Sequence, residues 1–406
     1  MLCRISKKER IFEKFRNKLI PVSLGFTRTI IDEINWKARL IGIKGARGVG
    51  KTTLMLQYIK KHYETDPSVL YVSLDDIWFS GNKLSDLTDR FVKQGGKILF
   101  LDEVHKYPYW SQEIKNIYDD FPALKIIFTG SSLLEISKGQ ADLSRRVIMY
   151  NMQGLSFREY LNYEVGTDLN HYSLDKILSD NIRISRDVTA QLKPLQHFSR
   201  YLRSGYYPFF KEVPELYYIR LSEVINTIID TELPLLRKFD VAKCYKIKQM
   251  LLAIAEESPF IPNIKMLSRL MDLERNTIIS YLGFLADAGL IRNLYHEAHG
   301  ISRMQKPAKI FLENTNIPFA IGSKHPSRIN VNETFLANQL AYSHKMTIPV
   351  NGSLLTDNGI LLVVENENNG EKKTRGSKYD NRYIASDSVE FGNGNVIPLW
   401  MFGFLY

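Results

Sequence analysis

The sequence predicts an α/β fold: a parallel sheet with helices on both faces, followed by a helical region and a smaller C-terminal α/β domain. Two observations carry the first part. Apolar strand-like runs alternate with helical stretches between residues 40 and 151, which is typical of a parallel sheet joined by crossover helices. A glycine-rich loop follows the first run, and a later run ends in two acids. Ligand sites in such sheets lie at the carboxyl ends of the strands.

The composition fits a globular protein with buried cores, since 44% of the 406 residues are hydrophobic and 24% are charged. No apolar run approaches the roughly 20 residues of a membrane helix. The charged first 20 residues also lack the apolar centre of a signal peptide. These features predict a cytoplasmic protein with no membrane partner.

The positive charge is concentrated near the N-terminus. The whole chain has a net charge of +10, and residues 1–44 hold eleven basic and four acidic side chains, or 11 − 4 = +7. A basic segment of this kind suits nucleic acid or an acidic partner. A solvated amphipathic helix explains the same pattern equally well.

The predicted parallel sheet has five strands, separated by helical stretches. The strand-like runs are Leu40–Ile43, Val69–Leu74, Lys97–Leu101, Lys125–Thr129 and Val147–Asn151. The four apolar residues at 98–101 indicate a buried strand.

The loop after the first strand carries the most specific motif. Residues 45–52 read GARGVGKT, a full match to the phosphate-binding P-loop. Glycines let backbone N–H groups wrap the phosphates, and the helix N-terminus behind them adds a positive dipole end. The motif predicts binding of ATP with Mg²⁺. The expected nucleotide-binding residues are Gly45, Gly48, Val49, Gly50, Lys51, Thr52 and Thr53.

The side chains of this loop have separate expected roles. Lys51 is expected to reach the β- and γ-phosphates, and the Thr52 hydroxyl is expected to be a ligand of Mg²⁺. Thr53 is expected near the α-phosphate.

A second motif, ILFLDEVHK at 98–106, places two acids directly after an apolar strand. Asp102 is the expected partner of Mg²⁺, directly or through water, and Glu103 the expected base for the attacking water. An Asp-Glu pair after a strand is by itself an ordinary loop start. Together with the P-loop in the same sheet, it favours a catalytic site.

Other polar residues near these strands are weaker candidates. After the strand KIIFTG, Thr129 or Ser131 is placed to touch the γ-phosphate or the water, although Ser131 equally suits a helix N-cap. Arg145 and Arg146 are candidates for stabilising the transferred phosphoryl group, within the chain or from a neighbouring subunit, and equally suit a surface position. His105 is most simply a loop histidine.

The motifs GARGVGKT, LDEVHK, FTGSS, SRRV, LSFREYL and GYYPF together resemble bacterial and archaeal AAA-domain ATPases with a C-terminal domain of unknown function. The resemblance covers nearly the whole chain. In that family the fourth motif commonly reads Gly-Arg, so Arg146 rather than Arg145 matches the arginine. The expected organisation is an AAA-type ATPase domain with a basic N-terminal helix at 1–160, a helical connecting or lid region at 161–240, a winged-helix-like domain at 241–314 and a nuclease-like domain at 315–406.

The winged-helix prediction comes from three helical stretches and a strand at 245–294, with a second strand at 309–314. If this domain binds DNA, its third helix enters the major groove with Arg275, Asn276 and Ser280 exposed. Its charge is weak for phosphate binding, because residues 262–294 carry only 4 − 3 = +1. Winged helices also serve as lids and protein-binding modules.

The last hundred residues read as a helix followed by three strands. The helix is expected at 332–343 and the strands at 360–364, 383–385 and 396–405. A polar stretch at 162–194 precedes the helical region.

The resemblance relates this last domain to PD-(D/E)xK nucleases, restriction-endonuclease-like folds. The matching metal ligands are Glu333, Asp357 and Glu365. The lysine expected two residues after Glu365 is replaced by Glu367, and the nearest lysines, 372 and 373, lie further on. We therefore expect a degenerate domain that is structural or binds a partner.

Two functions follow from these expectations. The first is a magnesium-dependent ATPase that acts as a nucleotide-dependent switch on an unidentified protein or DNA partner. The second is an ATP-gated nuclease with catalysis in the C-terminal domain, which the missing lysine disfavours. Both bind ATP and ADP, and both allow a homo-oligomer.

Overall fold

The computed structural model describes residues 9–130, 143–234, 242–297, 306–349, 354–365 and 381–406. The chain forms two compact units, residues 1–154 and 155–406. The finer division of the second unit at 160, 240 and 314 stays a prediction.

A five-stranded parallel sheet forms the centre of the first unit, in the order β2-β3-β4-β1-β5. The strands are β1 (Leu40–Lys44), β2 (Val69–Ser73), β3 (Ile98–Asp102), β4 (Lys125–Gly130) and β5 (Ile148–Asn151). The central strands are buried apolar runs, so the sequence prediction of the sheet is confirmed. Strand β4 separates β1 from β3, and because all these strands are parallel, the loops after β1 and after β3 both leave the carboxyl edge of the sheet.

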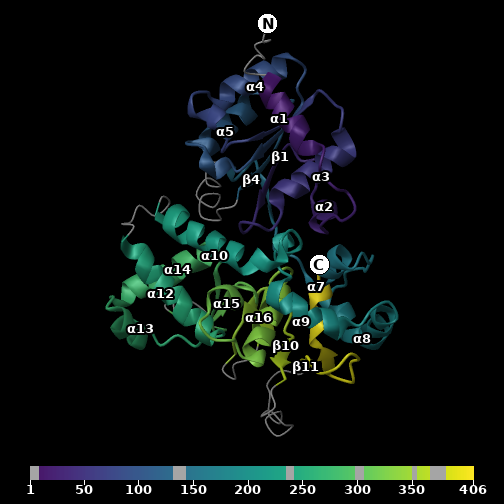
Figure 1. Ribbon diagram of the computed structural model, residues 1–406, viewed down its shortest axis with the longest axis vertical. Helices are drawn as coiled ribbons and strands as arrows, with labels where there is room; N and C mark the ends of the chain where they lie inside the picture. The colour runs from purple at the N-terminus through teal and green to yellow at the C-terminus, as the bar shows by residue number, and fades with distance from the viewer. Residues whose placement is uncertain (1–8, 131–142, 235–241, 298–305, 350–353, 366–380) are drawn as a thin grey trace. The chain divides into compact units, whose positions relative to one another are not determined.

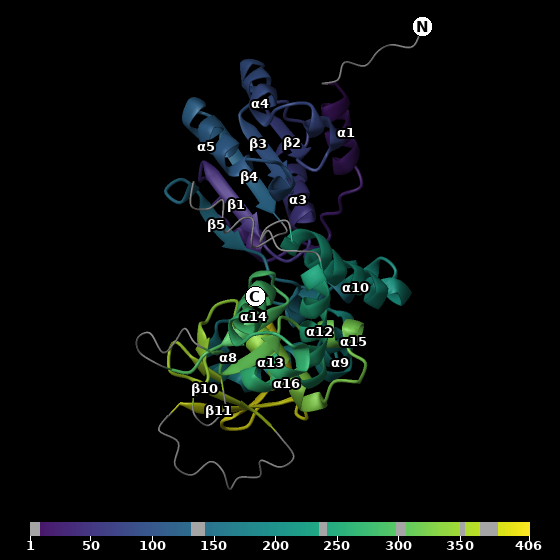
Figure 2. The same cartoon turned by 90° about the vertical axis from the view of Figure 1, so that its left-hand side faces the viewer.

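Helices cover both faces of this sheet. They are α1 (Glu9–Leu19), α2 (Ile30–Glu33), α3 (Lys51–Tyr63), α4 (Leu84–Lys93) and α5 (Trp110–Asp120). Figures 1 and 2 show α1 and α3 on one face and α4 and α5 on the other. Right-handed crossovers require this division, because α3 leads from β1 outward to β2 and the next two connections return.

The basic N-terminal segment is partly accounted for by α1. Its apolar side chains Ile11, Phe15 and Leu19 are buried at helical spacing, and the Phe15 ring stacks on Tyr71 of β2 with 6.1 Å between centroids. The helix is therefore an amphipathic element of the first unit, with its charges on the outer side.

The second unit is mainly helical in its first part. Its described helices are α7 (Phe157–Glu164), α8 (Leu174–Thr189), α9 (Pro194–Ser204), α10 (Tyr217–Thr227), α12 (Ala242–Glu257), α13 (Ile264–Met271), α14 (Arg275–Asp287), α15 (Ile317–Ile321) and α16 (Arg328–Leu340). A π-helical turn, Ile228–Glu232, extends α10. Helices α12 to α14 are followed by an antiparallel pair, β6 (Ile291–Leu294) and β7 (Lys309–Leu312).

A mixed sheet of five described strands follows, in the order β12-β11-β10-β9-β8. The strands are β8 (Met346–Thr347), β9 (Leu354–Thr356), β10 (Leu361–Val364), β11 (Arg382–Ser386) and β12 (Val396–Pro398). Strands β10, β11 and β12 are parallel, and β8 and β9 are antiparallel additions.

The predicted strand at 396–405 is wrong beyond its first three residues. After Pro398 the chain turns into a 3₁₀ helix, Leu399–Phe404, whose side chains Trp400, Met401 and Phe402 are fully buried. An unbroken apolar run suits a buried strand and a buried helix equally, so its periodicity does not distinguish them. Proline also lacks the N–H that would continue the ladder.

Aromatic packing holds the core of the second unit together. The ring of Phe157 meets Phe198, Tyr201 and Phe404 with centroid distances of 5.1, 5.5 and 6.3 Å. The carbonyl oxygen of Tyr406 accepts hydrogen bonds from Ser156 (2.6 Å) and Arg158 (2.9 Å). Segments some 250 residues apart thus share one core.

None of the helices in the described segments combines the length and the apolar character that crossing a membrane requires.

Candidate functional site

The loop between β1 and α3 has a backbone that only glycine suits. Gly48 and Gly50 adopt φ values of 87° and 99°, in the region that L side chains rarely enter. At Gly45, a Cβ would collide with the carbonyl group of Met152. Three of the predicted loop glycines are thus required by the fold itself, and Val49 between them is fully buried.

Lys51 opens α3 and lies back against this loop. Its side chain is buried, and its ammonium donates hydrogen bonds to the carbonyl oxygens of Gly45 (2.9 Å) and Ala46 (2.8 Å). The positive charge is therefore held at the concave side of the loop, together with the N-terminus of α3. Both features attract phosphate. Thr53, the residue after Thr52, is exposed.

A cluster of oxygen atoms surrounds Asp102 at the end of β3. The Thr52 hydroxyl donates to Asp102 Oδ2 at 2.7 Å, and the Tyr71 hydroxyl donates to the same oxygen at 2.8 Å. Thr129 at the end of β4 donates to the other carboxylate oxygen. The two predicted metal ligands, Thr52 and Asp102, are thus brought together. A hydroxyl and a carboxylate are the donors that Mg²⁺ accepts, so this pair fits the ion.

Glu103 directly follows this cluster in a strained conformation. Its φ of 54° lies in the left-handed region, which is uncommon for non-glycine residues and costs conformational energy. Its backbone N–H donates to Thr129 Oγ1 at 3.3 Å. Burial raises the pKa of the Glu103 carboxyl, and the negative charge of Asp102 raises it further, while Lys51 and Arg47 act against this. The carboxyl is thus poised to accept a proton.

His105 approaches Glu103 with 3.6 Å between Nε2 and the carboxylate. Burial lowers the pKa of His105 to about 3, and the charges of Lys106, Lys51 and Arg47 lower it as well. The imidazole is therefore neutral near pH 7, and the contact is not an ion pair at that pH.

The remaining catalytic candidates are not assembled with this group. Ser131 lies outside the described residues. Arg146 precedes β5, and the pairing of Ile41 with Ile148 places it at the amino edge of the sheet, away from the phosphate loop. There it forms two hydrogen bonds with Asp119 of α5, at 3.0 and 2.9 Å. Within one chain Arg146 does not reach the loop. A role in a neighbouring copy stays a prediction.

Sequence reasoning missed two residues of the site. Tyr71 is one of them, since a tyrosine in an apolar strand reads as core. Arg28 is the other. Its buried guanidinium donates to the Val49 carbonyl of the phosphate loop (2.9 Å) and to the carbonyls of Gln153 (2.8 Å) and Gly154 (2.7 Å). No local motif marks Arg28, because its partners are 21 to 126 residues away.

The exposed positions predicted for the third helix of the winged-helix-like segment are found as expected. Arg275, Asn276 and Ser280 of α14 are exposed, while Ile278 and Leu282 are buried.

The carboxylates proposed for a nuclease centre have separate partners. Glu333 pairs with Lys309 at 2.6 Å, Asp357 meets His344 at 3.2 Å, and Glu365 accepts hydrogen bonds from Ser386 and Ser388. Within the segments that the structure describes, no three His, Cys, Asp or Glu side chains form a group able to hold a metal ion. Positions 367, 372 and 373 lie outside those segments.

Comparison with known proteins agrees with the geometry of the first unit. Residues 37–161 match a family described as AAA domain. The chain is 26% identical to the uncharacterized protein MJ1637 of Methanocaldococcus jannaschii in an alignment 325 positions long, which covers 76% of this chain and 68% of that protein. It is 24% identical to MJ1544 of the same organism in an alignment 422 positions long, which covers 94% of this chain and 90% of that protein.

Among solved structures, the Walker-type ATPase PABY2304 of Pyrococcus abyssi is similar with a TM-score of 0.41 and 13% identity, over 78% of this chain and 97% of that one. The domain match, the parallel sheet and the phosphate loop identify an AAA-type P-loop domain in the first unit and support an ATP-binding ATPase. The winged helix and the nuclease-like domain remain predictions from the sequence.

Proposed function

We propose that this protein is a magnesium-dependent ATP hydrolase that acts as a nucleotide-dependent switch on a macromolecular partner, with DNA as the candidate. The observation that carries the proposal is the 2.7 Å hydrogen bond between Thr52 and Asp102. It joins the phosphate loop to the acidic strand end and places the Thr52 hydroxyl, Asp102 and the adjacent Glu103 at one edge of the sheet.

Each residue has a chemical task in this proposal. Lys51 and the loop N–H groups bind the β- and γ-phosphates, and Glu103 orients a water molecule and takes its proton. Thr52 and Asp102 hold Mg²⁺, which neutralises charge on the phosphate oxygens when bound. Arg146 of a neighbouring copy is the candidate for a further positive charge at the γ-phosphate.

The switch half of the proposal rests on the surroundings of the phosphate loop. Val49 of the loop is bonded to Arg28, and Arg28 also holds the chain at 153–154, where the first unit ends. A change in the loop on ATP binding therefore also affects the hydrogen bonds from Arg28 to the carbonyls at 153–154. Order and disorder of segments around a γ-phosphate are a common switching device.

We expect ATP with Mg²⁺ to change the protease sensitivity of the full chain, and ADP to change it differently. The measurement is limited proteolysis without nucleotide, with ADP and with a non-hydrolysable ATP analogue, beside a phosphate-release assay with and without EDTA. Hydrolysis should disappear with EDTA. Identical digestion patterns in all nucleotide states, with an unchanged oligomer size, would sink the switch; absence of hydrolysis with tight binding would leave a nucleotide-binding protein only.

Replacing Tyr71 by phenylalanine removes one hydrogen bond from Asp102 while keeping the ring against Phe15. A single such bond contributes about 1 kcal/mol, so we expect the Mg²⁺ concentration for half-maximal hydrolysis to change about fivefold. The matched control is Tyr118→Phe. Tyr118 lies on α5, away from the carboxyl edge of the sheet. Equal Mg²⁺ dependence in Tyr71→Phe and wild type would show that the hydroxyl does not position Asp102.

A further inference from the structure

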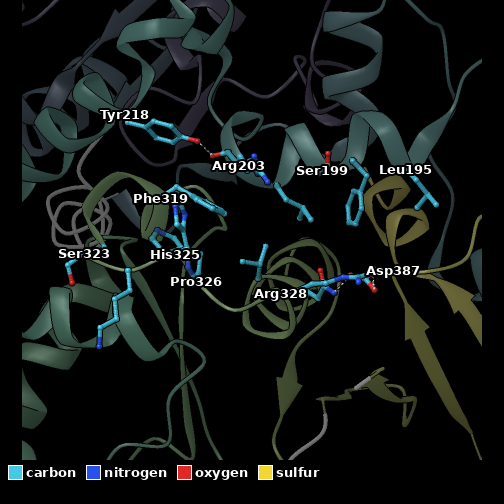
Figure 3. Close-up of a pocket in the computed structure, with 17 residues that line it drawn as sticks. Leu195, Ser199, Arg203, Tyr218, Phe319, Ser323, His325, Pro326, Arg328 and Asp387 are labelled. Carbon is cyan, nitrogen blue, oxygen red and sulfur yellow. Dashed lines mark hydrogen bonds and ion pairs between the residues drawn. The ribbon is translucent and has the colours of Figure 1, made fainter. Parts of the chain in front are cut away.

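An open cleft of about 1040 Å³ lies within the second unit. Helices α9 and α10, the turn between α15 and α16, and the first turns of α16 form its walls. In the view of Figure 3, Tyr218, Phe319 and His325 lie to the left and Arg328 with Asp387 to the right, with Arg203 above them. The volume is at the upper end of the roughly 300–1,000 Å³ of small-molecule pockets, and the cleft is open to solvent.

The cleft is lined by positive charge. The sequences of α9 (PLQHFSRYLRS) and of the turn 322–328 (GSKHPSR) contain basic residues and no acid. Within the described segments, Arg203, Lys324 and His325 make no ion pair. Arg328 pairs with Asp387, which is the only acid lining the cleft among the described residues. Behind the lining, Glu256 of α12 accepts a hydrogen bond from Ser323, the residue before Lys324. Among the residues that the structure describes, the positive charge that the cleft presents to an anionic ligand without an ion pair is therefore that of Arg203 and Lys324.

The walls that carry these charges are fixed by packing. A Cβ on Gly322 would lie 2.5 Å from the Pro318 carbonyl oxygen and 3.3 Å from that of Lys324, so the turn is tightly closed. Opposite it, Phe198 of α9 packs edge-on against Phe335 of α16, with 4.8 Å between centroids. The backbone that carries these charged side chains therefore needs little ordering when a ligand binds.

Aromatic rings accompany the charges. Phe319 is half-buried and Tyr218 is 38% exposed, and both line the cleft together with Arg203. The Tyr218 hydroxyl reaches the Arg203 carbonyl at 3.5 Å, which brings this ring close to the arginine. Exposed rings and a guanidinium plane between phosphate-binding cations are the groups on which unpaired bases stack.

We propose that this cleft binds a single-stranded nucleic acid, with Arg203 and Lys324 on its phosphates and Phe319 against a base. The proposal rests on the proposed function, in which the second unit meets a macromolecular partner, and names the chemistry of that partner. It places the contact away from α14, the helix that the sequence predicts for the major groove of DNA.

A second basic hollow provides the comparison. It lies on α13, is lined by Lys265 and Arg269 with Asn263, Met266 and Leu270, and has no aromatic ring among these residues. Among the described residues, each place thus has two lysine or arginine side chains without an ion pair, but base-stacking groups line only the cleft. This difference favours the cleft for unpaired bases, and it provides a matched control with the same number of charges removed.

The experiment is a fluorescence anisotropy titration of a labelled oligodeoxythymidylate with the full chain. It is carried out without ATP or ADP and over a range of salt concentrations. The cleft variant is Arg203→Gln with Lys324→Gln, and the control is Lys265→Gln with Arg269→Gln. Each phosphate contact on a single strand contributes about 0.7 to the slope of log affinity against log salt, so the cleft variant should lower that slope by about 1.4. Phe319→Ala should weaken binding about tenfold at an unchanged slope.

Circular dichroism and thermal unfolding check that each variant is folded, and ATP hydrolysis should be unchanged in all of them because the phosphate loop lies in the other unit. The proposal is overturned if the wild-type chain does not bind the oligonucleotide, if the α13 variant loses binding and the cleft variant keeps it, or if polyglutamate binds the cleft and the oligonucleotide does not. The titration contains no ATP or ADP, so its result can be interpreted even if the protein does not hydrolyse ATP.

Discussion

Replacing Glu103 by glutamine is expected to lower ATP turnover by about 100-fold or more while ATP binding is kept. The amide has nearly the shape of the carboxyl but does not accept the proton of the attacking water, and general bases contribute about 10²–10⁴-fold to rates. Glu103 directly follows Asp102 in the chain, and the raised pKa of its carboxyl reflects burial and the charge of Asp102.

The measurement is phosphate release at saturating Mg²⁺ and ATP, beside an equilibrium titration with a fluorescent ATP analogue. Glu64→Gln is the matched control, since Glu64 is an exposed residue at the end of α3 remote from the phosphate loop. If Glu103→Gln hydrolysed ATP at the wild-type rate, Glu103 would not be the base. Another group at this edge of the sheet would then have to accept the proton.

Replacing Lys51 by alanine is expected to weaken ATP binding as well as turnover. The ammonium is a buried positive charge held at the carbonyls of Gly45 and Ala46, next to the loop N–H groups. Hydrogen bonds to charged groups contribute about 1.5–3 kcal/mol, so the dissociation constant of ATP should rise roughly 10- to 150-fold.

The control for this variant is Lys61→Ala, on the same helix with an exposed side chain. In thermal unfolding at an ATP concentration near the wild-type dissociation constant, ATP should raise the unfolding temperature of Lys61→Ala clearly above its value without nucleotide, and that of Lys51→Ala much less. Equal protection of both variants by ATP would contradict the assignment of Lys51. The two predictions differ in kind, because Glu103→Gln separates binding from turnover and Lys51→Ala removes both.

Much of the first unit could be predicted from its sequence. Its strands are runs of four to six residues, mostly apolar and bounded by turns, and the loop glycines and Lys51 belong to one short segment. Asp102 and Glu103 are adjacent to a strand of the same kind. In these cases the residues that act together are near in sequence, or are brought together by the regular geometry of a parallel sheet.

The parts that could not be predicted depend on contacts distant in sequence. Tyr71 reaches Asp102 across neighbouring strands, 31 residues apart, and nothing in VLYVS distinguishes it from a core tyrosine. Helix α8 lies in the stretch that reads as polar. Its buried side chains, among them Ile177, Ile184 and Val188, form one stripe, and charged residues cover the rest of the helix. A mainly polar composition concealed that amphipathic pattern.

Arg28 has a thermodynamic consequence for the whole chain. One guanidinium donates hydrogen bonds to the backbone carbonyl of Val49 in the loop of residues 45–52 and to those of Gln153 and Gly154, where the first unit ends. Suppose that ATP binding changes the free energy of these three contacts, and that a partner binds the chain near residue 154 and changes the same contacts. The partner must then change the affinity for ATP by the same factor by which ATP changes the affinity for the partner, because linkage between two binding equilibria is reciprocal. Through Arg28, a partner that binds near residue 154 would then act as an effector that changes the affinity of the proposed nucleotide site for ATP.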